Sequence, residues 1–332
     1  MLLFRTDANA AIGMGHVTRS LALAEAWVQG GGRATFAMRE PPADVARRLD
    51  ALGIALARVS SAEDESAIAR ATRAGVVVVD GYEIDETHQR ALAAHGAKIV
   101  VVDDNAEIAS PVADVIVNGN PYATPALYAH LGGRPELLLG AEYTMLREAF
   151  RRAHQRTPAR PGAERILVSF GGSDPANLTP RAIDALRGTS FDVRVVVGGA
   201  NPRAADLRTQ AGARVRVDVA VGDMTEPMSW ADIAVVAAGG TSWELACLGV
   251  PAIAVVVADN QRRVGETLKR AGLAVVIDSA TDATPERLRE EVDRLGGDLE
   301  ARTRMARSGP ALIDGKGVLR ICDVLRRLGG EA

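Results

Sequence analysis

A histidine that could act as a base follows a glycine-rich turn close to the N-terminus, in the stretch Gly13-Met14-Gly15-His16. An apolar run precedes the turn and an amphipathic segment follows it, which predicts a strand, a glycine loop and a helix. The N-terminus of a helix disfavours a positively charged imidazole, so we expect His16 to be neutral and able to accept a proton from water or a hydroxyl. Asp7, at the end of the predicted strand, could orient the ring. Because lone histidines are more often structural, the spacing alone leaves both roles open.

The same turn could also bind an anion. Gly13 and Gly15 allow the backbone to approach a ligand closely, and the first N–H groups of the helix favour negative charge. A third glycine is missing, and no acidic residue ends the next predicted strand at residues 33–38, which argues against NAD or FAD. The absence of a Walker A sequence argues against a P-loop kinase or ATPase. A plain strand-to-helix turn is the alternative interpretation.

Two later turns have the same order of strand, glycines and helix. The first contains Gly171, Gly172 and Ser173, and the second contains Gly239, Gly240, Thr241 and Ser242. The hydroxyls of the second turn could cap the following helix and bind a phosphate. Glu244 would lie on the first turn of that helix, where a carboxylate can accept two ribose hydroxyls or simply complement the helix dipole.

The segments that must position these residues alternate between short apolar runs and longer amphipathic stretches. Runs rich in β-branched residues at 75–80, 98–104 and 113–118 are typical of buried parallel strands, and each ends in polar side chains. A segment rich in proline and glycine near the midpoint separates this series from a second one. We therefore predict an α/β protein with two Rossmann-like domains, residues 1–156 and 163–332, facing a central cleft. One large doubly wound sheet is the alternative.

The composition is that of an ordinary globular chain of 332 residues, with 39 basic and 42 acidic side chains and a net charge of −3. This balance argues against a broad nucleic-acid-binding surface. Cys247 and Cys322 lie in apolar, helix-like runs and predict buried free thiols, which fits a cytoplasmic protein. No Cys/His cluster indicates a metal site, and no apolar run is long enough for stable membrane insertion. Charges at Arg5 and Asp7 argue against a signal peptide.

A set of motifs, spread in order over nearly the whole chain, resembles the PseG family. These are the UDP-2,4-diacetamido-2,4,6-trideoxy-β-L-altropyranose hydrolases of pseudaminic acid biosynthesis. The N-terminal motif is Arg5-x-Asp7 followed by Gly13-x-Gly15-His16-x-x-Arg19. The other motifs are Asp80-x-Tyr82, Val102-Asp103-Asp104, Asn118-x-Asn120-x-Tyr122, Gly140-x-x-Tyr143-x-x-Leu146-Arg147, Phe170-Gly171-Gly172-Ser173-Asp174 with Asn177, Asn260-Gln261, and Leu312-Ile313-Asp314-Gly315-Lys316-Gly317. Each motif is weak by itself, whereas the ordered set is specific.

The resemblance implies a GT-B-like architecture, similar to that of the MurG glycosyltransferases. The nucleotide would bind mainly to the C-terminal domain, and the last helix, residues 317–328, would pack back on the N-terminal domain. The implied reaction is hydrolysis of a UDP-linked sugar at the anomeric carbon, which releases UDP and free sugar; we expect no metal and no other cofactor. His16 matches the catalytic base of the family, and Tyr82 and Asn260 match further active-site residues.

Together with the turns described above, the resemblance predicts a set of substrate-binding residues. They are Gly13, Gly15, Arg19, Gly171, Gly172, Ser173, Gly239, Gly240, Thr241, Ser242, Glu244 and Gln261. Two departures from the family pattern could mark a different substrate. The turn from Ala238 to Ser242 is richer in glycine than the version of the family, and the acidic Asp259 stands beside Asn260.

Three alternatives to a hydrolase stay open. A GT-B glycosyltransferase would pass the sugar to a sugar or lipid acceptor in the synthesis of a surface polysaccharide or glycoconjugate. A nucleotide-sugar sensor would bind the same ligand without turnover, and a UDP-sugar 2-epimerase would change the sugar. The sequence does not identify the sugar or the oligomeric state, although it is compatible with a monomer.

Overall fold

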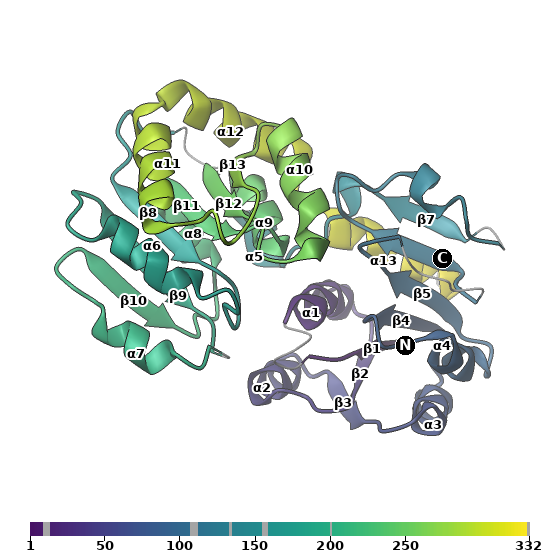
Figure 1. Ribbon diagram of the computed structural model, residues 1–332. Helices are drawn as coiled ribbons and strands as arrows, with labels where there is room; N and C mark the ends of the chain where they lie inside the picture. Colours follow the sequence, from purple (N-terminus) through teal and green to yellow (C-terminus); the bar gives the residue numbers. More distant parts are fainter. Residues whose placement is uncertain (9–13, 107–111, 133–134, 155–158, 200, 331–332) are drawn as a thin grey trace. The chain divides into compact units, whose positions relative to one another are not determined.

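The computed structural model describes residues 1–8, 14–106, 112–132, 135–154, 159–199 and 201–330 of the chain. The chain folds into two compact units, each of which contains one parallel sheet with helices (Figure 1). The first unit is formed by Met1–Glu148 together with Gly315–Ala332, and the second by Ala149–Asp314. The described residues from Gly315 to Gly330 are thus part of the first unit, although they follow the second unit in the sequence.

The first unit is built on a seven-stranded sheet in the order β3-β2-β1-β4-β5-β6-β7, with every neighbouring pair parallel. Its strands are β1 (Leu2–Thr6), β2 (Ala34–Met38), β3 (Ala55–Arg58), β4 (Val76–Asp80), β5 (Lys98–Val102), β6 (Val115–Asn118) and β7 (Glu136–Leu139). The order reverses between β1 and β4. Ligands of open α/β sheets bind at such a switch point, beyond the carboxyl ends of the strands.

Helices cover both faces of this sheet (Figure 1). They are α1 (Gly15–Gln29), α2 (Ala43–Ala51), α3 (Ala62–Thr72), α4 (Glu86–Ala93) and α13 (Gly317–Leu328), with the 3-10 turns η1 (Pro125–Tyr128) and η2 (Ala141–Tyr143). Side chains alternate along β1, as the pleat of a strand requires. Leu2 and Phe4 pack in a core with α1 and α13, and Leu3 packs in a second core with α3 and α4.

Helix α13 packs against α1 within the first unit. The guanidinium of Arg326 lies 5.6 Å from the ring centroid of Trp27. At the start of α13, a Cβ on Gly317 would lie 2.2 Å from the carbonyl oxygen of Thr144, so only glycine allows this close approach.

The second unit contains a six-stranded parallel sheet in the order β10-β9-β8-β11-β12-β13. Its strands are β8 (Arg165–Ser169), β9 (Asp192–Val197), β10 (Val215–Val219), β11 (Ile233–Ala237), β12 (Ala252–Val255) and β13 (Ala274–Ile277). Its helices are α6 (Leu178–Leu186), α7 (Ala204–Thr209), α8 (Thr225–Trp230), α9 (Gly240–Leu248), α10 (Arg262–Arg270), α11 (Pro285–Gly297) and α12 (Leu299–Leu312), with the 3-10 turn η3 (Asp259–Gln261). The order reverses between β8 and β11, so this sheet has a switch point of its own.

The predicted α/β class with two Rossmann-like parallel sheets is confirmed, and the alternative of one large sheet is wrong. The division between the units differs from the expected one, because the first unit ends at Glu148 and not near residue 156. Helix α5 (Glu148–Arg152) begins at this point, and its residues from Ala149 on belong to the second unit. Cys247 donates its thiol to the carbonyl of Phe150 at 3.9 Å, and its carbonyl lies 3.1 Å from Nδ1 of His154.

In the part of the chain that the structure describes, no helix has the length and apolar character needed to cross a bilayer. Both cysteines are buried and unpaired, as predicted.

Candidate functional site

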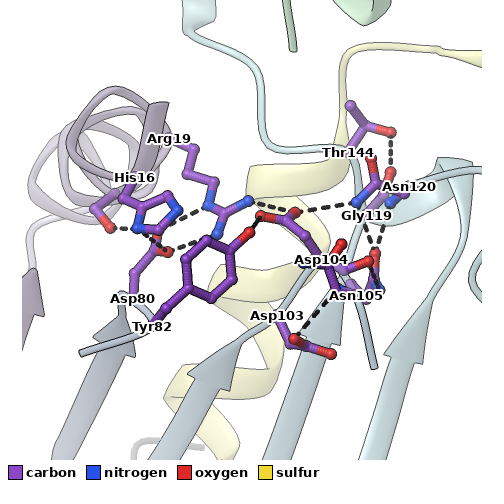
Figure 2. A network of polar contacts seen from close by, with 12 residues as sticks. His16, Arg19, Asp80, Tyr82, Asp103, Asp104, Asn105, Gly119, Asn120 and Thr144 are labelled. Atoms are coloured by element: carbon purple, nitrogen blue, oxygen red, sulfur yellow. Dashed lines mark hydrogen bonds and ion pairs between the residues drawn. The ribbon is translucent and has the colours of Figure 1, made fainter. Parts of the chain in front are cut away.

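His16 is the second residue of α1 and only 8% exposed. Its Nδ1 lies 3.8 Å from Oδ1 of Asp80, the last residue of β4 (Figure 2). The Asp80 carboxylate is completely buried. The first turn of α1 thus places the imidazole beside a buried carboxylate at the switch point of the sheet, and at this distance Nδ1 of His16 makes no hydrogen bond.

Asp7, which was predicted to orient His16, has other hydrogen-bond partners in the structure. Asp7 accepts hydrogen bonds from Nη1 of Arg5 at 2.7 Å and from the backbone N–H of Arg39 at 2.8 Å. The carboxylate beside His16 comes from the neighbouring strand, because β1 and β4 are paired with Thr6 opposite Asp80. Asp7 lies one residue beyond this pair and belongs to a different network. The sequence could not show which strand lies next to β1.

Arg19 follows His16 by one helical turn and is held between two carboxylates. Its Nε and Nη2 donate to the two oxygens of Asp80 at 2.8 and 2.6 Å, and its Nη1 donates to Oδ1 of Asp104 at 2.6 Å. Burial would lower the pKa of Arg19, but the negative charges of Asp104 and Asp80 outweigh it and raise that pKa well above the usual value. Arg19 was predicted to bind substrate, whereas three of its donors are used to tie α1 to the ends of two strands.

Tyr82 closes this group on the exposed side. Its ring meets the ring of His16 edge-on, with centroids 4.9 Å apart and an interplanar angle of 79°. Its hydroxyl donates to Oδ2 of Asp104 at 3.1 Å. Desolvation of the hydroxyl and the negative charge of Asp104 raise the pKa of Tyr82 above its usual value. Two of the residues predicted to be catalytic, His16 and Tyr82, are therefore in direct contact.

A second layer of hydrogen bonds fixes the segment that carries Asp104. Tyr128 donates its hydroxyl to Asp103 at 2.6 Å, and the amide of Asn118 donates to that hydroxyl at 2.9 Å and to the Asp104 carbonyl at 3.1 Å. Asn120 donates to Oδ1 of Asp104 at 3.1 Å. Asp80, Asp104 and Asn120 were not among the predicted site residues, although polar residues at the ends of buried strands were the signal that could have identified them.

The Arg19–Asp104 pair predicts a specific dependence of stability on pH. Burial by itself would raise the pKa of Asp104, but the charge and the hydrogen bond of Arg19 hold it below the usual aspartate value. A lowered pKa stabilises the fold above the unfolded-state value of about 3.9, and this contribution is lost as the pH falls through the folded-state value. The difference in unfolding free energy between wild type and Asp104→Asn should therefore be constant from about pH 5 to 8 and shrink below about pH 4. Urea denaturation at a series of pH values measures it, and a difference that persists in acid would contradict the pairing.

The second unit presents a glycine turn at the start of α9. Gly239 is the N-cap residue and Gly240 begins the helix, directly after β11. The hydroxyl of Ser242 is buried and donates to the carbonyl of Ala237 at 3.3 Å, so it closes the turn. Thr241 and Glu244 are half-buried on the same first turns of the helix. Backbone N–H groups at such a helix start are a binding site for anions.

The turn after β8 lies against the turn after β9. Gly171 has φ of +82°, which favours glycine, and a Cβ on Gly198 would lie 2.2 Å from the carbonyl oxygen of Gly172. Ser173 is half-buried. The next residue, Asp174, accepts hydrogen bonds from the backbone N–H groups of two α6 residues at 2.9 and 2.8 Å, and therefore caps that helix.

The remaining predicted residues have diverse environments. The side-chain oxygen of Gln261 accepts from the backbone N–H of Val257 at 3.0 Å, and its amide nitrogen would lie 3.7 Å from a Cβ on Gly239. Gln261 thus adjoins the α9 turn, whereas Asn260 is exposed on η3. Gly15 is the exposed first residue of α1, and Gly13 lies outside the described residues. In the described part of the chain, no group of His, Cys, Asp and Glu side chains could hold a metal ion.

Comparisons with known proteins identify the fold of this chain. Residues 166–312, most of the second unit, match the model of the glycosyltransferase family 28 C-terminal domain. The chain superposes on the crystal structure of MurG from Acinetobacter baumannii with a TM-score of 0.67 and 18% identity, over 98% of this chain and 99% of that one. The protein therefore has the GT-B glycosyltransferase fold, and the predicted fold is confirmed.

Two named proteins are similar to this chain in sequence. The chain is 26% identical to the spore coat polysaccharide biosynthesis protein SpsG of Bacillus subtilis, over 70% of each protein. It is 34% identical to the UDP-N-acetylglucosamine–N-acetylmuramyl-(pentapeptide) pyrophosphoryl-undecaprenol N-acetylglucosamine transferase of Sorangium cellulosum, over 54% of this chain and 47% of that one. The match thus spans about half the length of the transferase.

Proposed function

We propose that the protein transfers a sugar from a nucleotide-sugar to an acceptor hydroxyl, in the synthesis of a surface polysaccharide or glycoconjugate. The names of the relatives support this class of reaction, since one acts in polysaccharide biosynthesis and the other is a transferase that uses UDP-N-acetylglucosamine. The match of residues 166–312 to a glycosyltransferase domain supports a nucleotide site in the second unit.

The observation that carries the proposal is the pairing of His16 with Asp80 at the switch point of the first sheet. A neutral imidazole at this position accepts the proton of the acceptor hydroxyl as its oxygen bonds to the anomeric carbon. The bond between that carbon and the diphosphate breaks with its electron pair on the diphosphate, so UDP leaves as an anion. Attack from the face opposite the leaving group inverts the anomeric centre.

The α9 turn is the part of the second unit best suited to hold the leaving diphosphate. The first backbone N–H groups of α9 come directly after the N-cap residue Gly239. The start of a helix stabilises the negative charge that develops as the bond to the sugar breaks. Glu244 lies on the same helix, where its carboxylate would accept the ribose hydroxyls.

Replacing Glu244 by alanine tests the nucleotide site without any turnover. We expect UDP to bind about 10–100-fold more weakly, because the two ribose hydroxyls lose a charged acceptor worth about 1.5–3 kcal/mol. A nucleotide that lacks the 2′-hydroxyl should lose less affinity than UDP in the variant. Isothermal titration of wild type, Glu244→Ala and the exposed control Glu300→Ala, with both nucleotides, measures the effect. Equal loss for the two nucleotides would remove Glu244 from the ribose.

Hydrolysis is a second candidate, in which water takes the place of the acceptor hydroxyl and the roles of His16 and the α9 turn are unchanged. It is favoured by the ordered motifs that resemble the PseG family, from Gly13-x-Gly15-His16 to Asn260-Gln261. The deciding experiment measures UDP release from UDP-N-acetylglucosamine and from a UDP-linked 2,4-diacetamido-2,4,6-trideoxy sugar, with and without a sugar or polyprenyl-linked acceptor. Release that requires the acceptor supports transfer. Fast release without acceptor supports hydrolysis, and stable binding without release under any condition contradicts both.

A further inference from the structure

Tyr82 is 56% exposed, and yet both ends of its side chain have a defined partner. The ring edge meets His16, and the hydroxyl donates to Oδ2 of Asp104 (Figure 2). An exposed aromatic side chain loses rotational freedom when it is held in one place, so its position must be stabilised by such contacts. One edge-on ring contact is worth only about 0.5–1.5 kcal/mol. A hydrogen bond to a charged acceptor is worth about 1.5–3 kcal/mol, so the bond to Asp104 contributes more than the ring contact to holding Tyr82.

Asp104 is itself held in place by hydrogen bonds to its other carboxylate oxygen, Oδ1. Oδ1 accepts from Nη1 of Arg19 at 2.6 Å and from the amide of Asn120 at 3.1 Å, which leaves Oδ2 directed to Tyr82. Asn120 is only 9% exposed and also donates to Oδ1 of Asn118 at 2.9 Å. Charge-assisted hydrogen bonds of this length are stronger than neutral ones. The Asp104 carboxylate is therefore held in a fixed position. In the series of contacts from Arg19 through Asp104 and Tyr82 to His16, only Tyr82 is exposed.

We propose that Asp104 is a positioning residue that holds Tyr82 against His16 and so fixes the orientation of the base. Asp80 flanks His16 on the Nδ1 side, and Tyr82 restrains the ring from the exposed side. Arg19 connects the two flanks, because it donates to Asp80 and to Asp104. A base held in this way meets the acceptor hydroxyl in one orientation through its other ring nitrogen, Nε2. The inference rests on the proposed role of His16 as the base and adds to it the residues that align it.

The first test is independent of turnover. In protein labelled with ¹³C on histidine, tyrosine and phenylalanine, so that the ring at position 82 is labelled in every ring-bearing variant, the wild type should give a nuclear Overhauser effect between the ring protons of His16 and Tyr82. The effect should disappear in Tyr82→Phe, which keeps the ring and removes only the hydroxyl, and in Asp104→Ala. It should persist in Tyr143→Phe, a matched loss of a hydroxyl elsewhere in the first unit. An effect that persists in Tyr82→Phe overturns the proposal, even if Asp104→Ala fails to fold.

The second test uses the rate of UDP release. Misplacement of a base by about 1 Å can cost on the order of 10²-fold. We expect Tyr82→Phe and Asp104→Ala to lower kcat by about 10–100-fold with little change in KM for the nucleotide-sugar, and the double variant to lower it no further. Additive losses, or a lost Overhauser effect with an unchanged kcat, overturn the proposal. If the wild type turns over no nucleotide-sugar, the proposed function fails while the Overhauser test still decides whether Asp104 holds Tyr82.

Discussion

Replacing His16 by alanine should lower the rate of UDP release by about 10²–10⁴-fold, the usual worth of a general base. The loss should fall on kcat, because the methyl group cannot accept the proton of the acceptor hydroxyl. The affinity for UDP should change little, since the residues proposed to hold the nucleotide lie in the second unit. Steady-state kinetics with the nucleotide-sugar, together with calorimetric titration of UDP, separate the two effects.

His88→Ala is the matched control for this variant. His88 is a half-buried histidine of α4, and its Nδ1 lies 2.8 Å from Oδ1 of Asp85, the N-cap residue of that helix. It therefore has the same kind of carboxylate neighbour as His16 at a different place. We expect it to keep the wild-type rate. Near-normal turnover of His16→Ala, or an equal loss in both variants, would remove His16 from the reaction. The fold and the nucleotide site would be unaffected by that outcome.

Replacing Arg5 by methionine should destabilise the first unit by about 3–5 kcal/mol, the cost of leaving a buried charge without its partner. Arg5 is fully buried and donates to Glu65 at 2.5 Å and to Asp7 at 2.7 Å. Glu65 is 1% exposed, and its second oxygen has no hydrogen-bond partner. Methionine fills a similar volume, so the main effect is the isolated Glu65 carboxylate. Because Arg5 joins β1 to α3, the loss should be confined to the unit that carries His16.

The unfolding of this unit can be followed separately. Trp27 lies in the first unit, and the other two tryptophans, Trp230 and Trp243, lie in the second and can be replaced by phenylalanine. Urea denaturation followed by Trp27 fluorescence then measures the loss. The double variant Arg5→Met/Glu65→Leu should recover part of it, because the isolated Glu65 carboxylate is removed while Asp7 keeps its hydrogen bond from the backbone N–H of Arg39. Arg90→Met, which breaks the exposed pair with Glu86, should cost less than about 1 kcal/mol. A single variant as stable as wild type would show that the buried pair does not hold β1 to α3.

The site was only partly predictable, and the residues show why. His16 could be found because a histidine between a glycine turn and an amphipathic helix is a local pattern. The two carboxylates that surround this site could not be found in the same way. Asp80 and Asp104 lie 61 and 85 residues from Arg19, the residue that binds both of them. Asp7 was the nearest candidate along the chain, and the parallel pairing of β1 with β4 brings Asp80 to His16 instead.

The amino-acid sequence by itself determined the local features of this protein: buried β-branched strands, helices that begin after glycine turns, and the alternation that makes an α/β chain with two sheets. These depend on propensity and on hydrophobic periodicity within short segments. The tertiary structure alone decided which strands are neighbours, that α13 packs on α1, and that Arg19 ties Asp80 to Asp104. Strand order is set by the packing of helices on both faces of the sheet, which involves contacts between distant segments. The polar network around His16 is therefore a consequence of the fold and is not written in any one motif.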